Sequence, residues 1–420
     1  MRSERYDLWR ALPSGRVVLA GRWALETSTS GEYRRSAFRY DREYLQADHG
    51  SLDPVALDYS AQGQEFEGSG IPPILDELLP GRWETAVMIR HWRAMRLPYS
   101  PRDLHDLLSF GRQVFSAGAL AITPAGDPPP ALTRGWHIKH LSELVATASQ
   151  VDPNTANPGL EPEPEAIARL HAGSPVSGAR PKALVYDAKG QYLAKFARAD
   201  DPFSHVRVEY ACMSLARQAG LPAPDARIET IAGGEVLLTR RFDITEEGGR
   251  NHVLSANAML KDAGSWEDCS FPSYEGIVDL IARHSSAVEH DLKQMFGQML
   301  FNRAINNVDD HLRNFAFLQA GGRWRLTPAY DLVPDLALGK DHQLSWNYQY
   351  APPTLDAAAA AAKAFRLTER EAETIADRVK GGLAIWPEIF ERCGVSAEDI
   401  AKIERVVTAP PAPSEGLSPN

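Results

Sequence analysis

Asp309, Asn314 and Asp331 are the residues whose types and spacing could do chemistry. Asp309 and Asn314 lie five positions apart, and Asp331 follows two short apolar runs that Gly321 and Gly322 separate. In phosphoryl transfer one carboxylate orients the acceptor hydroxyl, an asparagine five residues later binds a metal ion, and a second carboxylate binds metal and phosphates. Because Mg²⁺ prefers oxygen ligands, the spacing predicts phosphoryl transfer with Mg²⁺ held by Asn314 and Asp331.

The local sequence predicts a hairpin that returns Asp331 to Asn314. Residues 315–318 form an apolar run that is typical of a buried strand, and residues 323–327 alternate polar and apolar side chains before Pro328. Asp-Asp-His in a loop is, on its own, more often turn or capping chemistry than catalysis. The combined spacing favours catalysis.

This stretch resembles the catalytic signature of the HipA family of serine/threonine kinases, the toxins of bacterial toxin–antitoxin pairs. The matching residues are Asp309-x-His311-x-x-Asn314-Phe315 and Leu326-Thr327-Pro328-Ala329-Tyr330-Asp331-Leu332. The resemblance implies that Asp309 accepts the hydroxyl proton, that Asn314 and Asp331 hold Mg²⁺, and that His311 has a structural role in the catalytic loop. A zinc site at His311 would need nearby His and Cys partners, which the sequence lacks. A general-base role for His311 stays open from its usual pKa range.

Upstream residues could hold ATP. The Gly- and Ser-rich turn at 173–182 precedes a strand-like run, and small residues let backbone N–H groups approach phosphates closely. Lys195 lies in the apolar run 191–196, where an unpaired lysine is costly, and Glu209 near the start of a predicted helix is its candidate partner. The alternatives are a solvent-facing Lys195 and a Glu209 that only complements the helix dipole.

The resemblance implies an ATP site made of loop residues, the lysine–glutamate pair, two hinge residues acting through their backbone, and the two metal-binding residues. These are Ser174, Val176, Ser177, Gly178, Ala179, Lys182, Lys195, Glu209, Arg240, Phe242, Asn314 and Asp331. In the best-known toxins of the family a serine in this loop is autophosphorylated, which ejects the loop and silences the kinase. Pro175 aligns with that serine, so autophosphorylation of Ser174 or Ser177 stays open.

The length and composition limit which kinds of protein this chain can be. A chain of 420 residues exceeds one typical core and predicts two lobes, while 44% hydrophobic and 24% charged residues are ordinary for a globular protein. No apolar run is long enough for a membrane span, and the first residues have no signal-like apolar segment. Three widely spaced cysteines are typical of a reduced, cytoplasmic protein. A net charge of −10 does not favour direct DNA binding, so we expect DNA contact only through a partner.

Breaks rich in proline divide the chain into predicted parts. These are an N-terminal β-rich subdomain like that of HipA (1–130), a kinase N-lobe with phosphate loop and ATP lysine (135–243), a mainly helical C-lobe with the catalytic loop (244–407), and a disordered tail (408–420). Residues 250–275 are expected to be irregular. The predicted fold is therefore α+β, two-lobed and protein-kinase-like.

The predicted activity is ATP- and Mg²⁺-dependent phosphorylation of a serine or threonine in a protein. The resemblance implies a HipB-like helix-turn-helix antitoxin as partner and a translation factor, such as an aminoacyl-tRNA synthetase, as target. Two alternatives stay open, a small-molecule phosphotransferase and a non-catalytic nucleotide-binding regulator or co-repressor. The filled catalytic positions argue against the second. The residues name neither target nor antitoxin, and they leave toxicity and oligomeric state open.

Overall fold

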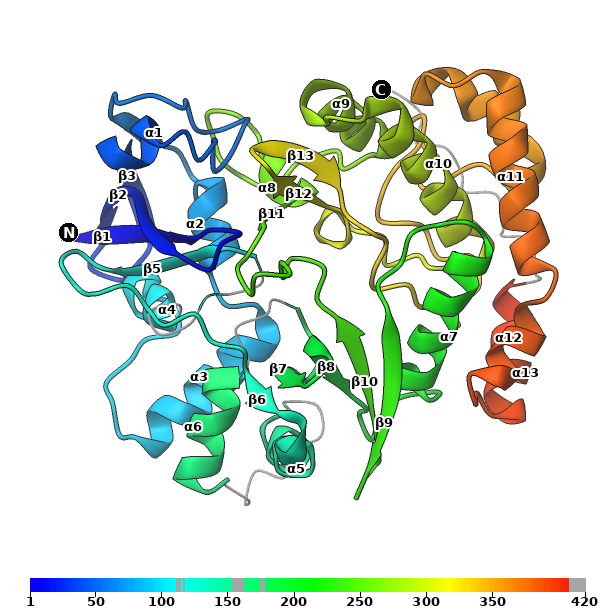
Figure 1. The fold of residues 1–420 in the computed structure, drawn as a ribbon, viewed down its shortest axis with the longest axis horizontal. Helices are drawn as coiled ribbons and strands as arrows, with labels where there is room; N and C mark the ends of the chain where they lie inside the picture. Colours follow the sequence, from blue (N-terminus) through cyan, green and yellow to red (C-terminus); the bar gives the residue numbers. More distant parts are fainter. Residues whose placement is uncertain (111–114, 116–117, 153–161, 174–177, 233, 408–420) are drawn as a thin grey trace.

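The structure is a computed structural model that describes residues 1–110, 115, 118–152, 162–173, 178–232 and 234–407. Within these ranges the strands form three sheets, with orders β4-β3-β2-β1-β5, β6-β7-β8-β10-β9 and β11-β12-β13. Figure 1 shows the first sheet at the left, the second below the centre, and the helices of the C-terminal half at the right. The predicted tail and the predicted loop residues Ser174, Val176 and Ser177 lie outside the described residues.

The N-terminal sheet is antiparallel throughout and encloses an aromatic core. Its strands are β1 (Arg2–Ala11), β2 (Val17–Thr27), β3 (Tyr33–Tyr40), β4 (Gln64–Glu67) and β5 (Leu120–Pro124), with α1 (Arg42–Gln46), α2 (Pro73–Leu78) and α4 (Leu104–Phe110) beside them. The rings of Trp23 and Phe38 lie 4.9 Å apart between centroids. This aromatic packing contributes to the stability of the sheet beyond simple burial.

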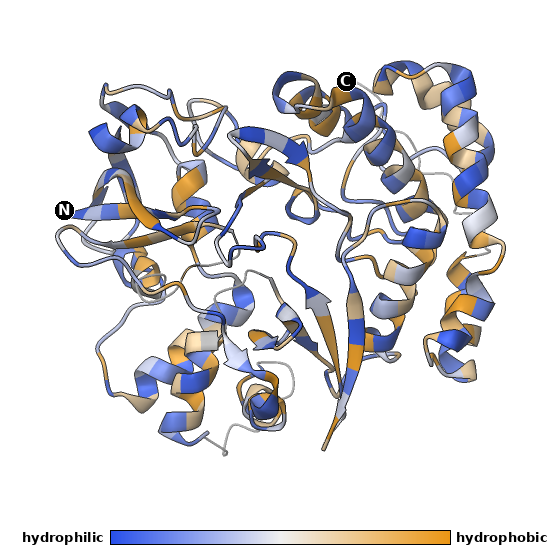
Figure 2. Ribbon diagram, viewed as in Figure 1, coloured by the Kyte–Doolittle hydropathy of each residue, from blue (hydrophilic) through white to orange (hydrophobic). Residues whose placement is uncertain are grey.

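The second sheet carries Lys182 and Lys195 on neighbouring strands. It consists of β6 (Trp136–His137), β7 (Lys182–Asp187), β8 (Gly190–Phe196), β9 (Ala226–Ile231) and β10 (Gly234–Arg240). The register of the β7–β8 hairpin sets Lys182 opposite Lys195. Hydrophilic and hydrophobic residues alternate along much of β9 (Figure 2), which lies at one edge of this sheet and has no fully buried residue.

Helices cover both faces of the second sheet. On one face lie α3 (Arg82–Ala94), α5 (Leu141–Val151) and α6 (Pro164–Gly173), whose apolar side chains share a core cluster with β7, β8 and β10. On the other face α7 (His205–Gln218) packs Val206 and Met213 against Leu237. The helix α3 comes from the sequence region 1–130, yet it lies against this sheet (Figure 1).

The C-terminal half is mainly helical and surrounds the third sheet. Its elements are β11 (His252–Ser255), α8 (Ala256–Met259), α9 (Tyr274–His284), α10 (Val288–Ala304), the 3₁₀ turn η2 (Leu312–Asn314), β12 (Ala316–Ala320), β13 (Arg323–Leu326), the 3₁₀ helix η3 (Leu355–Phe365), α11 (Glu369–Leu383), α12 (Trp386–Arg392) and α13 (Ala397–Val407). None of the helices in the described ranges is long and apolar enough to cross a bilayer.

The expectation that residues 250–275 are irregular is wrong in part. β11 pairs with β12, with Leu254 opposite Phe317, and α8 begins directly after it with Ser255 as its N-cap. A strand of four residues is too short to give a periodic signal in the sequence. Its place in the sheet depends on β12, which lies about sixty residues further along the chain.

Candidate active site

The catalytic loop begins where α10 ends at Ala304. Asn306 has a φ of 56°, a left-handed conformation that asparagine adopts more readily than most residues. Its amide nitrogen donates to the carbonyl of Asp335 at 2.6 Å, which fixes the turn. The chain then passes through buried Val308 to Asp309, whose side chain faces solvent, and Asp310, whose side chain is buried.

Asp309 is held by two neighbours. Gln343 donates its amide nitrogen to Oδ1 of Asp309 at 2.8 Å, and the amide nitrogen of Asn314 donates to the Asp309 carbonyl at 2.8 Å. Burial raises the pKa of the Asp309 carboxyl, as does the negative charge of Asp331, whereas His311 lowers it. A raised pKa brings a carboxylate closer to the range in which it can accept a proton efficiently.

Asp331, which follows the hairpin, lies beside Lys195. Strands β12 and β13 pair antiparallel, and the segment after β13 leads to Asp331, whose Oδ1 lies 2.7 Å from Lys195 Nζ. The same ammonium lies 2.5 Å from Oε1 of Glu209 on α7. Lys195 on β8 is therefore ion-paired both with Glu209 on α7 and with Asp331 after the hairpin.

The charges in this cluster stabilise one another. The Lys195 ammonium lowers the pKa of Asp331 well below its usual range, although burial opposes that shift. Burial favours neutral Lys195, but the carboxylates of Asp331 and Glu209 outweigh it and raise the pKa of the lysine. Lys195 and Asp331 are thus both charged at neutral pH.

Three hydrogen bonds fix the segment that precedes Asp331. Gln294 on α10 donates its side-chain amide to the Thr327 carbonyl at 2.6 Å, and the Ala329 N–H donates to the Pro222 carbonyl at 2.8 Å. The Tyr330 hydroxyl donates to the Arg313 carbonyl at 2.9 Å. Asp331 itself has a φ of 58°. Its carboxylate is therefore aimed by a turn that contacts three other segments.

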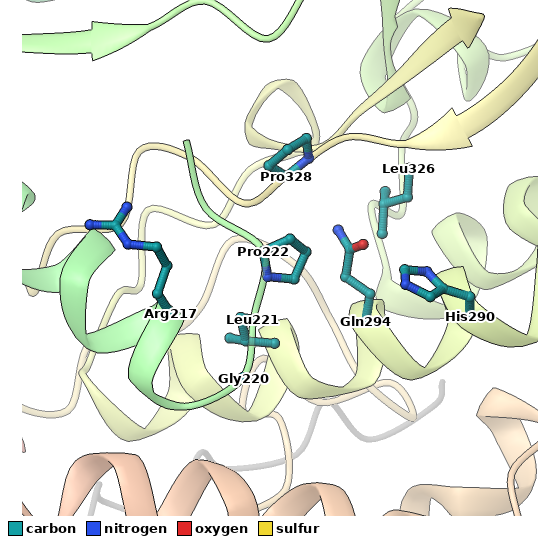
Figure 3. A pocket seen from close by; sticks show the side chains of 8 residues that line it. All are labelled: Arg217, Gly220, Leu221, Pro222, His290, Gln294, Leu326 and Pro328. Atoms are coloured by element: carbon teal, nitrogen blue, oxygen red, sulfur yellow. The ribbon is translucent and has the colours of Figure 1, made fainter. Parts of the chain in front are cut away.

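A cavity of about 540 Å³ is lined in part by Leu326 and Pro328, just before Asp331, and not by the catalytic loop. Figure 3 shows the residues that line it: Arg217, Gly220, Leu221, Pro222, His290, Gln294, Leu326 and Pro328. None of the three residues with catalytic spacing lines it. The hydrogen-bonded cluster, and not this cavity, is the candidate active site.

Asp310 is a site residue that the sequence analysis missed. Its side chain is 0% exposed and accepts hydrogen bonds from the Tyr274 hydroxyl at 2.5 Å and the Gln343 N–H at 2.8 Å, while His342 Nδ1 lies 2.8 Å away. Asp310 thereby holds the catalytic loop to the loop that carries Gln343. The signal in the sequence was the adjacent pair of aspartates, of which Asp309 is exposed and Asp310 is buried.

Replacing Asp310 is expected to destabilise the catalytic loop. Asp310→Ala leaves Tyr274 and His342 without their buried acceptor, so we expect the free energy of unfolding to fall by about 3 kcal/mol. Urea unfolding measures this change. Asp356→Ala, which removes an exposed partner of Lys380, is the control and should leave the midpoint nearly unchanged. Equal midpoints for the two variants would contradict the role given to Asp310.

Of the predicted phosphate loop, Gly178, Ala179 and Lys182 are described. Gly178 has a φ of 136°, and a Cβ at this position would lie 2.1 Å from Nζ of Lys182, so the lysine folds against the glycine. Burial, and then the charge of Lys195, lower the pKa of Lys182. The structure therefore brings Lys182 into the Lys195 cluster.

The predicted hinge residues and His311 lie at the edge of this cluster. The Arg240 N–H donates to the Asp225 carbonyl at 2.7 Å, so an adenine here would have to meet other backbone groups of the hinge. The Phe242 ring lies 6.0 Å from that of Tyr330. The carbonyl of His311 accepts the Asn314 N–H at 2.8 Å at the start of η2, and its buried Nδ1 has no hydrogen-bond partner among the described residues.

The available donor set fits Mg²⁺. Among the described residues no group of three or more His, Cys, Asp and Glu side chains could hold a metal ion. Mg²⁺ usually takes only one or two carboxylates from the protein and completes its shell with phosphate oxygens and water. Asp331 supplies a carboxylate, and Asn314, whose amide nitrogen is engaged by the Asp309 carbonyl, has its amide oxygen left for a metal.

Comparison with known families matches two parts of the chain. Residues 17–123 match the HipA N-terminal domain, and residues 174–386 match the HipA-like C-terminal domain. Together the matches cover most of the N-terminal sheet, from β2 onward, and the candidate active site.

Two curated relatives match part of the chain. A Haemophilus influenzae protein named as a candidate kinase is 23% identical over 38% of this chain and 52% of its own length. The toxin YjjJ of Escherichia coli K12 is 25% identical over 40% of each chain. The matched region thus spans about half the length of these relatives or less.

A solved structure has the same fold over nearly the whole chain. It is the Shewanella oneidensis MR-1 HipA in complex with HipB and operator DNA, with a TM-score of 0.66 and 18% identity, covering 95% of both chains. The likeness supports the predicted α+β, two-lobed, kinase-like organisation with an N-terminal β-rich part. At this identity it shows the fold alone.

Proposed function

The chain belongs to the HipA family, and from this premise we propose that it is an ATP- and Mg²⁺-dependent kinase for serine or threonine hydroxyls of a protein. The observation that carries the proposal is the position of Lys195 Nζ between Glu209, at 2.5 Å, and Asp331, at 2.7 Å. This is the lysine–glutamate and metal-aspartate arrangement that kinases need for transfer. Relatives named as a toxin and a candidate kinase support it.

Each side chain has a defined part in the proposed reaction. Lys195, held by Glu209, would contact the α- and β-phosphates of ATP, and Asp331 with Asn314 would hold Mg²⁺. The metal ion would supply positive charge against the charge that develops on the phosphates. Asp309, oriented by Gln343, accepts the proton of the attacking hydroxyl. The hydroxyl oxygen forms the new bond to the γ-phosphorus, while the bond between the γ-phosphorus and the leaving oxygen of ADP breaks.

The activity should be lost at acidic pH, and the loss should begin above the usual pKa of an aspartate side chain. Asp309 acts as a carboxylate, and burial and Asp331 raise its pKa, so the rate is lost as pH falls through that raised value, above the ordinary value of about 3.9. His311 lowers this pKa, so His311→Gln should move the acid limb to higher pH. The measurement is kcat against pH at saturating ATP. A limb that stays in place or moves to lower pH would contradict the assignment of Asp309.

A HipB-like helix-turn-helix antitoxin is the partner that we propose. The matched HipA structure contains HipB and operator DNA. A net charge of −10 gives this chain no bulk attraction to DNA, which supports contact with DNA through the partner.

The acceptor class can be tested directly. The purified full-length chain is supplied with γ-labelled ATP and Mg²⁺ in a bacterial extract, and label is counted separately in precipitated protein and in small molecules. The proposal expects label on protein serine or threonine, in dialysed and undialysed extract alike. Label only in the small-molecule fraction would instead support a small-molecule phosphotransferase.

A further inference from the structure

Helix α3 connects the N-terminal region to the phosphate loop. Trp83 at its first turn is 1% exposed and packs in the cluster that includes Ala183, Val185 and Ala194 of the second sheet. The first turn of the helix thus contributes a buried ring to the core of this sheet, although it lies about a hundred residues earlier in the sequence.

Trp83 donates two hydrogen bonds, one to each end of the segment 178–182, which is the described arm of the loop. Its backbone N–H donates to the Gly178 carbonyl at 3.0 Å, and its indole Nε1 donates to the Lys182 carbonyl at 2.9 Å. The three residues between these carbonyls, 179–181, are therefore held at both ends by one side chain and its own backbone. Loss of a hydrogen-bond donor is most costly when the acceptor that it leaves stays buried.

The Lys182 ammonium lies beside this arm. Lys182 is buried, its Nζ lies against Gly178, and it stands opposite Lys195 in the β7–β8 register. Besides Lys195, the charged groups that act on it are the carboxylates of Asp331, Glu209 and Glu84. Two buried ammonium groups on adjacent strands repel each other unless carboxylates offset the repulsion.

We propose that Trp83 is a positioning residue for ATP that holds the Gly178–Lys182 arm in place. The inference rests on the ATP site proposed above and adds a helix from the N-terminal region to it. Trp83 acts through the backbone of the arm and does not itself touch the nucleotide.

Trp83→Phe tests the indole hydrogen bond. The full-length variant keeps an aromatic ring but loses the donor to the Lys182 carbonyl, so we expect Kd and KM for ATP to rise about tenfold, with kcat changing less. Trp92→Phe is the matched control on the same helix, where the indole packs against Tyr99 at 5.0 Å between ring centroids. Calorimetric titration with ATP and Mg²⁺ measures Kd. Equal Kd values in the two variants would overturn the role of Trp83.

The same titration separates this inference from the proposed function. If the wild type bound no ATP, the proposed function would fail as well, whereas wild-type binding with equal Kd values in Trp83→Phe and Trp92→Phe overturns this inference alone.

Discussion

Asp309→Asn should abolish phosphoryl transfer while ATP stays bound. The amide has nearly the shape of the carboxylate and keeps contact with Gln343, but it cannot accept the hydroxyl proton. Loss of a general base lowers the rate by about a thousandfold. In the proposed site, ATP is bound through Lys195 and Asp331, so its affinity should change little. Transfer is measured as label moved from ATP to protein, and binding by calorimetry.

The control for this substitution is Asp341→Asn, which changes an exposed aspartate in the loop that follows Asp331. It should transfer phosphate at the wild-type rate. A rate within a few-fold of the wild type in Asp309→Asn would remove Asp309 from the mechanism. Parallel loss of ATP binding and transfer would mean that Asp309 acts on the nucleotide and not on the acceptor.

Asp331→Asn should cost as much activity by a different route. The substitution removes the carboxylate proposed to bind Mg²⁺ and leaves Lys195 paired with Glu209. Asparagine tolerates the φ of 58° at this position, whereas alanine would add backbone strain to the loss of the ligand. We expect kcat to fall by about a thousandfold, and the Mg²⁺ concentration for half-maximal activity to rise.

Asp335→Asn is the matched control, four residues further along and paired with Lys340 in the wild type. It should leave the Mg²⁺ dependence unchanged. Wild-type turnover in Asp331→Asn would contradict the metal assignment. The double variant Asp309→Asn with Asp331→Asn should lose little more than either single variant, because groups that act in one transition state do not contribute additively.

The local parts of this site could be predicted from the sequence. The hairpin between Asn314 and Asp331 is a short-range feature, since two apolar runs around Gly321 and Gly322 specify both strands and the turn. Lys195 inside an apolar strand needed a partner, and α7 supplies Glu209 fourteen residues later. In each case the signal lay within one supersecondary unit.

The parts that were missed depend on contacts between distant segments. Asp310 is held by Tyr274 and His342, and nothing near Asp310 in the sequence identifies either of them. The short strand β11 exists only because β12 pairs with it. Trp83 reaches the loop from about a hundred residues away. Periodicity and capping signals are local, so none of these contacts leaves a mark in them.

The most direct test of the proposed reaction is a product balance. The purified chain is incubated with ATP, Mg²⁺ and dialysed extract protein, and both ADP and protein-bound phosphate are counted, beside Asp309→Asn. The account predicts equal molar amounts of ADP and phosphoserine or phosphothreonine for the wild type, and neither product for the variant. Bound ATP without either product in the wild type, or ADP with free phosphate alone, would contradict it.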